Sequence, residues 1–380
     1  MEGENGNGKL EHWLEILRSI SSKERLDRDK GEEKLTKIVA KTKTFDAAIL
    51  GPFCEEIGTN LEKNEAPWNE TYGALTAARI LLNSTHFAPE EEFLSRLKAG
   101  VLPNLCHEEP RVRNSAVALI APICKKSPEA VAYFIVGCLD FDEKISLEIA
   151  QNGQNLKIGL LETSINGLSA AISAADKESK SENFEKLLEI AGEYCDHQNL
   201  FVRTACFDLL GSLIRPPAPF VEADRNFESL ARILKVGLSD YWCQVRLAAS
   251  RVVRVFVEVW PLKEKEYSRR YISILLPAIC LNRYYFGDGG IHALSQGTWR
   301  NFTMDQGLSL VSEHIIVVAS HYISVATTKH PADVINHYVT EAAIRGILEL
   351  VEKIDTDLTA PFTARFYQAA MKGAGDDDWQ

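Results

Sequence analysis

The sequence predicts an all-α chain, a right-handed α-solenoid of about seven helix-pair repeats. Two observations carry this prediction. Apolar residues recur with the 3.6-residue period of helices along most of the chain, and no useful run alternates as a strand would. In addition, one pattern of small and apolar residues returns at intervals of about 45 residues, the length of one helix pair in such arrays.

The repeat is clearest after three Val-Arg pairs, Val112-Arg113, Val202-Arg203 and Val245-Arg246. Small or apolar residues follow each valine at the same distances; after Val202 they are Ala205, Cys206, Leu209, Leu210 and Leu213, and after Val245 they are Ala248, Ala249, Val252, Val253 and Phe256. These distances trace one face of a helix, with small residues near its start that let neighbouring helices approach closely.

The same pattern continues where Val-Arg is lost. From Val202, the anchors Val245, Ile291 and Val339 follow at intervals of 43, 46 and 48 residues. A copy in a less definite register falls at 158–172, and a weaker one at 74–82. Each copy is the second helix of a pair, so the first helix and a short polar loop come before it.

The loops carry an acidic residue ahead of the arginine: Asp196 precedes Arg203, and Asp240 precedes Arg246. This arrangement resembles the HEAT repeat family of the HEAT/armadillo-type superfamily, over residues 60–355. The resemblance implies an architecture rather than an activity. We expect the repeated arginines to form a structural ladder, each donating to an acidic loop residue nearby.

The ends of the chain differ from the repeats in composition, and we expect one array without an internal linker. The expected organisation is a disordered N-terminus at 1–8, a single solenoid over 9–372, and an acidic tail at 373–380. Within the solenoid we expect N-terminal cap helices at 9–55, repeats at 60–355, and a C-terminal cap helix at 356–372.

Composition narrows the possible functions. Apolar residues make up 46% of the chain and charged residues 25%, which excludes wholesale disorder. The net charge of −11 argues against a surface that binds nucleic acid over its whole extent. The window 241–302 is the exception, because it holds nine basic residues against four acidic ones.

No motif for catalysis, cofactor or metal emerges. The sequence Gly3-x4-Gly8-Lys9 is followed by Leu10, where a phosphate loop needs Ser or Thr. Two histidines on a helix need a spacing of four residues and a third ligand to hold zinc, whereas His314 and His321 are seven apart. We therefore expect no enzyme activity, no cofactor and no metal.

The eight cysteines include no Cys-x-x-Cys pair, and several fall inside apolar helical segments. This usage favours a reducing compartment, the cytosol or the nucleus. No apolar leader and no run of about 18 apolar residues occurs, so we expect no membrane partner.

Aromatic residues stand in the loops that precede several second helices. In a solenoid such loops align along one edge, and Trp, Tyr and Arg dominate interface hot spots. The candidate contacts are Trp68, Tyr241, Trp242, Arg251, Arg254, Arg283, Tyr284 and Tyr285. The other interpretation, in which each aromatic side chain tucks under a neighbouring loop, stays open.

The predicted function is a non-enzymatic scaffold or adaptor for protein–protein interaction. Its partner is another protein of unknown identity, either alone or within a multi-subunit complex. The alternative is an enzyme that resembles the HEAT-like alkylpurine DNA glycosylases, or another nucleic-acid-binding protein, that uses the basic segment 246–300. The net charge makes nucleic acid the weaker prediction.

Overall fold

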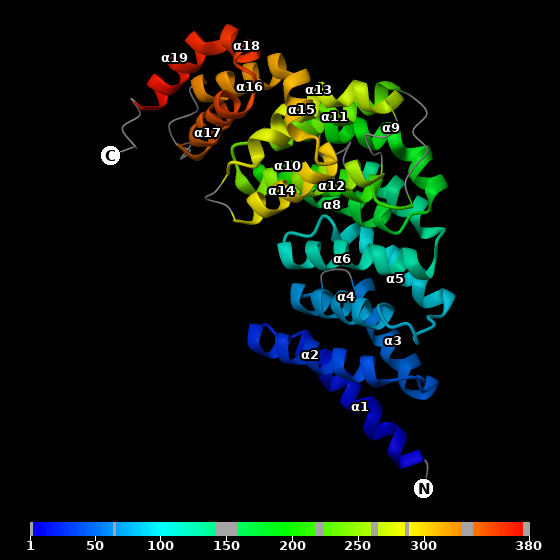
Figure 1. The fold of residues 1–380 in the computed structure, drawn as a ribbon. Coiled ribbons are helices and arrows are strands. Elements are labelled where there is room, and N and C mark those ends of the chain that lie inside the picture. The colour runs from blue at the N-terminus through cyan, green and yellow to red at the C-terminus, as the bar shows by residue number, and fades with distance from the viewer. Residues whose placement is uncertain are drawn as a thin grey trace, which may run out of the picture. The chain divides into compact units, whose positions relative to one another are not determined.

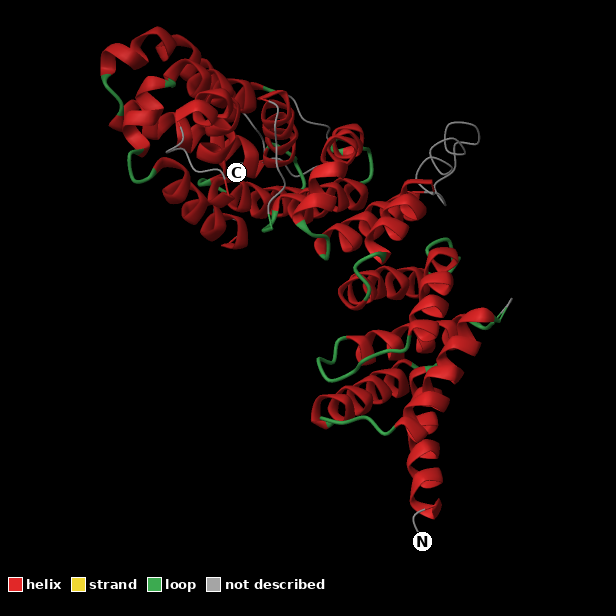
Figure 2. Cartoon of the chain, turned by 90° about the vertical axis from the view of Figure 1, so that its right-hand side faces the viewer, coloured by secondary structure: helices red, strands yellow, loops and turns green. Residues whose placement is uncertain are grey.

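The described part of the chain consists of helices joined by turns and loops. The computed structural model describes residues 3–63, 66–140, 158–217, 224–259, 265–285, 289–328 and 337–374. Within these ranges no strand occurs (Figure 2), which confirms the all-α prediction. The chain divides into two compact units, Met1–Ser179 and Lys180–Gln380. We describe each unit by itself.

Unit 1 consists of antiparallel helix pairs. Its helices are α1 (Gly3–Ile20), α2 (Arg25–Lys41), α3 (Ala47–Glu62), α4 (Trp68–Leu82), α5 (Glu91–Asn104), α6 (Pro110–Lys126), the helix Ala130–Asp140, and α8 (Ile158–Ser173). Second helices pack on second helices, α4 on α6 and α6 on α8, while α3 packs on α5. Figure 1 shows α2, α4 and α6 one above another, with α3 and α5 beside them.

Unit 2 repeats this plan and adds short helices at its end. Its helices are α9 (Lys177–Tyr194), α10 (Leu200–Ile214), α11 (Asp224–Leu238), α12 (Cys243–Val259), α13 (Lys265–Asn282), α14 (Gly289–Thr303), α15 (Gly307–Glu313), α16 (Ile315–Thr327), α17 (His337–Lys353), α18 (Thr356–Thr359) and α19 (Thr363–Ala374). Here α10, α12 and α14 pack in succession, as do α11 and α13. The helices α17 and α19 both pack on α16.

The ends of the chain differ from the expectation. Helix α1 begins at Gly3, inside the segment 1–8 for which disorder was expected. The single C-terminal helix expected at 356–372 is instead α18, a 3-10 turn at Ala360–Phe362 and α19. Helix α19 continues to Ala374, and the rest of the acidic tail lies outside the described residues.

The core contains the apolar stripes that the repeat pattern predicts. All five stripe residues after Val202, and all five after Val245, are buried. Outside the stripes, Gly237 of α11 lies so close to α10 that an added Cβ atom would overlap the ring of Phe207. The face read from the sequence is therefore confirmed as the packing face.

Polar side chains mark where several helices begin. Asp46 accepts a hydrogen bond from the backbone N–H of Ala48 at 3.0 Å, and Asn199 accepts one from Phe201 at 2.8 Å. Asp355 does the same for Asp357 at 2.9 Å. Each side chain satisfies an N–H group that has no partner inside its helix, so these residues start α3, α10 and α18.

No single helix in the described ranges is long and apolar enough to cross a membrane. The helices α15 and α16 together meet that criterion by length and composition, but the chain bends by 88° between them.

Candidate protein interface

The repeated arginines hold the loop that precedes their own helix. Arg203 donates through Nη1 to the carbonyl oxygens of His197 and Gln198, at 2.6 and 3.2 Å. Arg246 donates in the same way to Asp240 and Tyr241, at 2.8 and 2.9 Å. In both cases the acceptors lie six and five residues before the arginine. The guanidinium group thus closes the turn between the two helices of a pair.

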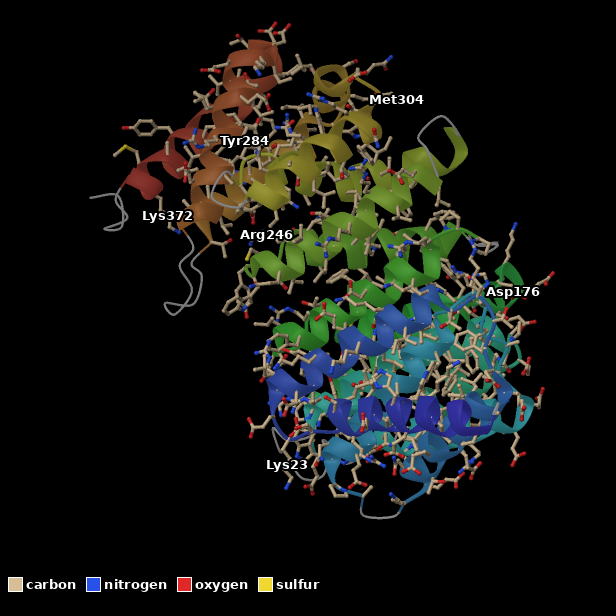
Figure 3. All side chains as sticks on the ribbon, turned by 90° about the horizontal axis from the view of Figure 1, so that it is seen from below. Lys23, Asp176, Arg246, Tyr284, Met304 and Lys372 are labelled. Carbon is tan, nitrogen blue, oxygen red and sulfur yellow. The ribbon has the colours of Figure 1, made fainter. Side chains whose placement is uncertain are left out.

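The same geometry occurs in unit 1. Arg113 donates to the carbonyl oxygens of His107 and Glu108, at 2.8 and 3.0 Å. Arg28 donates to those of Ser22 and Lys23, at 3.0 and 2.7 Å, although it follows Asp27 rather than a valine. Lys23 is labelled in Figure 3. Arg28 is therefore a member of the ladder that the sequence analysis did not identify.

One rung also joins two successive repeats. Arg203 donates to the Asp240 carboxylate through Nε at 2.6 Å and through Nη2 at 3.1 Å. Both side chains are buried, with exposed fractions of 3% and 5%. The acidic partner expected for Arg203 was Asp196, in its own loop. The structure corrects this expectation, since Asp196 is exposed and the carboxylate comes from the following repeat.

Asp240 organises the loop that carries two candidate contacts. Its Oδ1 atom also accepts a hydrogen bond from the backbone N–H of Trp242 at 2.8 Å. The guanidinium carbon of Arg203 lies 5.2 Å from the centre of the Tyr241 ring, at cation–π distance. Both aromatic side chains remain 39% exposed, and their ring centres are 6.0 Å apart. The loop therefore presents a fixed Tyr-Trp pair to the outside.

A further exposed aromatic residue lies one repeat earlier. Phe201, in the first turn of α10, is 57% exposed and stands two residues before Arg203. The sequence analysis did not select Phe201. Its position in the first turn, outside the apolar stripe that starts at Val202, is the signal that could have identified it.

Trp68 occupies a different setting. It begins α4 rather than lying in the preceding loop, and it is half-buried. The guanidinium carbons of Arg28 and Arg111 each lie 5.3 Å from its ring centre. Trp68 therefore connects α2, α4 and α6 through cation–π contacts, and only part of its ring is open to a partner.

The three candidate contacts that follow α13, Arg283, Tyr284 and Tyr285, are largely buried in unit 2. Tyr285 is 3% exposed, and its ring centre is 4.1 Å from the guanidinium carbon of Arg246. Arg283 donates to Glu349 at 2.7 Å and lies 4.2 Å from the ring centre of Trp299. Tyr284 also donates to Glu349. Figure 3 labels Arg246 and Tyr284 in this region.

Burial and pairing perturb the ionisation of this cluster. Burial raises the pKa of the Tyr284 hydroxyl far above its usual value. Burial alone would raise the pKa of the Glu349 carboxyl, but Arg283, Tyr284 and Lys353 hold it below its usual value. The cluster is thus a closed ionic network in which Glu349 stays charged.

Arg251 and Arg254, the two remaining candidates, are exposed on α12. Arg254 pairs with Glu258 one turn later, at 3.1 Å. Two other basic residues of the window 241–302, Arg246 and Arg283, are committed to buried contacts. Arg251, Arg254 and Arg300 are thus the exposed arginines among the described side chains of this window.

Unit 2 also contains a polar cavity of about 320 Å³ next to the Glu349 network. Trp299, Arg300 and Lys353 are among its lining residues. Asp305 also lines it, and Asp305 and its neighbour Met304 have left-handed backbone angles (φ 62° and 48°), which are uncommon for residues with a side chain. Met304 is labelled in Figure 3.

The described residues contain no group of three or more histidine, cysteine, aspartate or glutamate side chains that could hold a metal ion. Five of the eight cysteines are buried, Cys124, Cys138, Cys195, Cys206 and Cys280. Burial raises the pKa of Cys124 and of Cys280 to about 12, so both stay protonated at neutral pH.

The chain is similar in structure to importin-β proteins. It matches importin-β with a TM-score of 0.56 and 12% identity, over 95% of this chain and 45% of that one. It matches Kap95p, the yeast importin-β, in a structure with RanGDP, with a TM-score of 0.53 and 16% identity over 96% and 45% of the two chains. A Kap95–Nup1 complex gives 0.52 and 16% over the same shares.

The chain has a HEAT/armadillo-type helical-repeat architecture. It spans about 45% of the length of these importin-β chains, and at such low identity the likeness shows the fold alone. No protein-family model matches the sequence. No curated protein matches it either.

Proposed function

We propose that this protein is a non-enzymatic scaffold that binds another protein through the loop edge of unit 2. The observation that carries the proposal is the Tyr241-Trp242 pair, which the buried Arg203–Asp240 ion pair fixes in a half-exposed position. A fixed aromatic side chain loses little conformational entropy on binding, and Trp and Tyr are enriched among interface hot spots.

The surroundings support a protein partner over nucleic acid. Phe201 adds a third exposed aromatic ring in the same turn of α10 as Arg203. The charges of Arg203 and Asp240, next to the aromatic pair, are buried and paired with each other. A phosphate backbone would need free cations here, whereas apolar side chains of a protein would not. Helical-repeat folds also present extended surfaces and seldom carry chemistry.

The test is quantitative affinity purification with mass spectrometry. The intact protein is compared with a Tyr241→Ala/Trp242→Ala variant and with the matched control Tyr367→Ala. Tyr367 is also exposed (67%) and lies in unit 2, on α19. We expect a partner that the control retains and the double variant loses at least about tenfold, as a loss of about 1.4 kcal/mol or more predicts.

The double variant must also keep the helical circular dichroism and the unfolding midpoint of the intact protein. Retention of every partner by the double variant would reject this edge as the interface. Recovery of nucleic acid without a protein partner would reject the scaffold proposal itself.

A further inference from the structure

Unit 1 contains a pocket that is larger than the polar cavity of unit 2. Its volume is about 420 Å³, within the range of ligand pockets. It opens between the loop before α3 and the loop before α5, and its walls come from those loops and helices. Its apolar lining is Phe45, Leu50, Cys54, Phe87 and Phe93.

The apolar lining is held in place from behind. The rings of Phe45 and Phe87 meet edge to face at 5.6 Å, and those of Phe87 and Phe93 at 6.3 Å. Lys126, from α6, donates to the carbonyl oxygens of Ser84 and Phe87 at 3.0 and 2.6 Å. These contacts fix the loop before α5, so the pocket is formed before anything binds.

On one wall of the pocket the charged side chains are paired with each other. Arg96 donates to Glu62 through Nε at 2.6 Å and to Glu55 through Nη1 at 2.7 Å. Its guanidinium group lies across Gly58, where a Cβ atom would meet it at 2.5 Å. Arg96 therefore spans from α5 to α3 as a neutralised clamp and contributes no free charge to the pocket.

The opposite wall carries free negative charge. Glu90 and Glu92 line the pocket, and their carboxylates form no ion pair or hydrogen bond within the described ranges. Glu90 occupies the N-cap position of α5, yet its carboxylate makes no cap hydrogen bond. The negative charge of Glu90 also acts on Cys54, which lines the pocket. Burial, and to a smaller extent Glu90, raises the pKa of the Cys54 thiol to about 12. The one unpaired cation of the lining is Lys43, on the loop before α3.

We propose that this pocket anchors one large apolar side chain of a partner polypeptide, with a lysine or arginine next to the anchor facing Glu90 and Glu92. The apolar floor provides burial of the side chain, and the free carboxylates select the sign of the flanking charge. The inference rests on the proposed function only in taking the ligand to be a protein. It concerns a different unit and a different set of residues.

The probe is the acetylated and amidated peptide Ser-Lys-Phe-Lys-Ser, titrated into the full chain and followed by saturation-transfer NMR. Two further peptides replace Phe by Ala, or both Lys by Glu. We expect saturation of the Phe ring protons in the first peptide, and a dissociation constant at least about tenfold weaker for each of the others. Equal binding of all three peptides would overturn the proposal, as would no binding at millimolar concentration.

A variant of the protein locates the binding. Gly51 lines the pocket on α3, and apart from its chain neighbours no atom lies within 4 Å of an added Cβ, so Gly51→Leu adds a side chain at the pocket. Because Pro52 follows it in the helix and disfavours a larger residue there, the variant must also keep the helical circular dichroism and the unfolding midpoint of the intact protein. The matched control is Gly8→Leu on α1, where the space is equally open. We expect Gly51→Leu to abolish peptide binding and Gly8→Leu to leave it unchanged. Binding that survives Gly51→Leu would overturn the assignment.

The charge is tested with Glu90→Gln/Glu92→Gln against Glu91→Gln, which lies in the same turn but outside the pocket lining. The double variant should weaken the peptide about threefold to tenfold and reduce the salt dependence of binding, and the single control should not. A homodimer of the full chain that Gly51→Leu dissociates in sedimentation would instead assign the pocket to a second copy. A partner that depends on Tyr241 and Trp242 but tolerates Gly51→Leu would leave the scaffold proposal intact and overturn this one.

Discussion

Arg203 and Asp240 form a buried, two-pronged ion pair that joins consecutive repeats of unit 2, with hydrogen bonds of 2.6 and 3.1 Å. The same aspartate accepts from the backbone N–H of Trp242 and offers its own carbonyl to Arg246. One loop residue thus couples two arginines of the ladder and sets the position of the exposed aromatic pair. Stability and the proposed interface depend on the same side chain.

Removal of this carboxylate should be costly. Asp240→Ala leaves the Arg203 charge buried without a counter-charge, which costs about 3–5 kcal/mol in comparable pairs. The measurement is urea unfolding followed by circular dichroism, with the exposed Asp196→Ala as the control, expected within about 0.5 kcal/mol of the intact protein. The double change Arg203→Met/Asp240→Leu removes the uncompensated charge but also the turn-closing hydrogen bonds of Arg203, so we expect it to recover only part of the loss. An Asp240→Ala protein as stable as its control would contradict this account of the pair.

Arg28, the member of the arginine ladder that was not predicted from the sequence, can be tested in unit 1. Arg28→Met keeps the length of the side chain but removes two charge-assisted hydrogen bonds and the contact with Trp68. We expect a loss of about 2–3 kcal/mol, seen as faster hydrogen exchange in α1 and α2. Arg25→Met, which breaks an exposed pair with Asp29, should leave exchange unchanged. Similar exchange in both variants would remove Arg28 from the ladder.

Close helix packing predicts opposite effects for two glycines. Gly237→Ala pushes a methyl group into the fully buried Phe207 ring and should destabilise unit 2 by about 1–3 kcal/mol. At Gly192 the nearest atom to an added Cβ is 3.5 Å away, so Gly192→Ala should stabilise α9 by up to about 1 kcal/mol. Thermal unfolding of the two variants checks the signs. A neutral Gly237→Ala would mean that Phe207 can move aside.

His321 gives unit 2 a pH dependence. Burial, followed by the nearby charge of Lys235, lowers its pKa from 6.5 to about 4, and its Nε2 atom has no partner in the described structure. Because the unfolded chain binds the proton more readily, the stabilisation is present above pH 6.5 and is lost as the pH falls toward 4.

The expected loss over this interval is on the order of 3 kcal/mol relative to His321→Gln, which does not titrate. The measurement is the free energy of unfolding of both proteins as a function of pH. Parallel curves for the two proteins would show that His321 is accessible to protons in the folded state.

The buried apolar stripes were predictable because the residues on one face of a helix recur at fixed short intervals in the sequence. The offsets after Val202 and Val245 depend only on residues within three turns of one helix, and all of them are buried as predicted. Arg28 departs from the Val-Arg pattern, because Asp27 stands where the other copies have an apolar residue before the arginine. Its distance to Arg113, near twice the repeat length, was the available signal.

Contacts between repeats were not predictable in the same way. The order of residues pairs Arg203 with Asp196, but the stacking of successive loops brings Asp240 to it instead. Likewise, Tyr284 looks like a loop residue in sequence, whereas its hydroxyl donates to Glu349, 65 residues later. Such distant partners decide which aromatic side chains of the loops stay exposed. Only the structure therefore shows that Tyr241 and Trp242 are more exposed than Tyr284 and Tyr285.

The most direct test of the central claim replaces Trp242 with the photoreactive residue p-benzoylphenylalanine, which preserves an aromatic side chain at the proposed contact. The same replacement at Tyr367, exposed on α19, serves as the reference position. On irradiation in cell extract, the scaffold account predicts one defined protein cross-linked at position 242 and absent at position 367. Cross-linking at 367 but not at 242, or no cross-link at 242 while the purified protein still captures its partner, would contradict it.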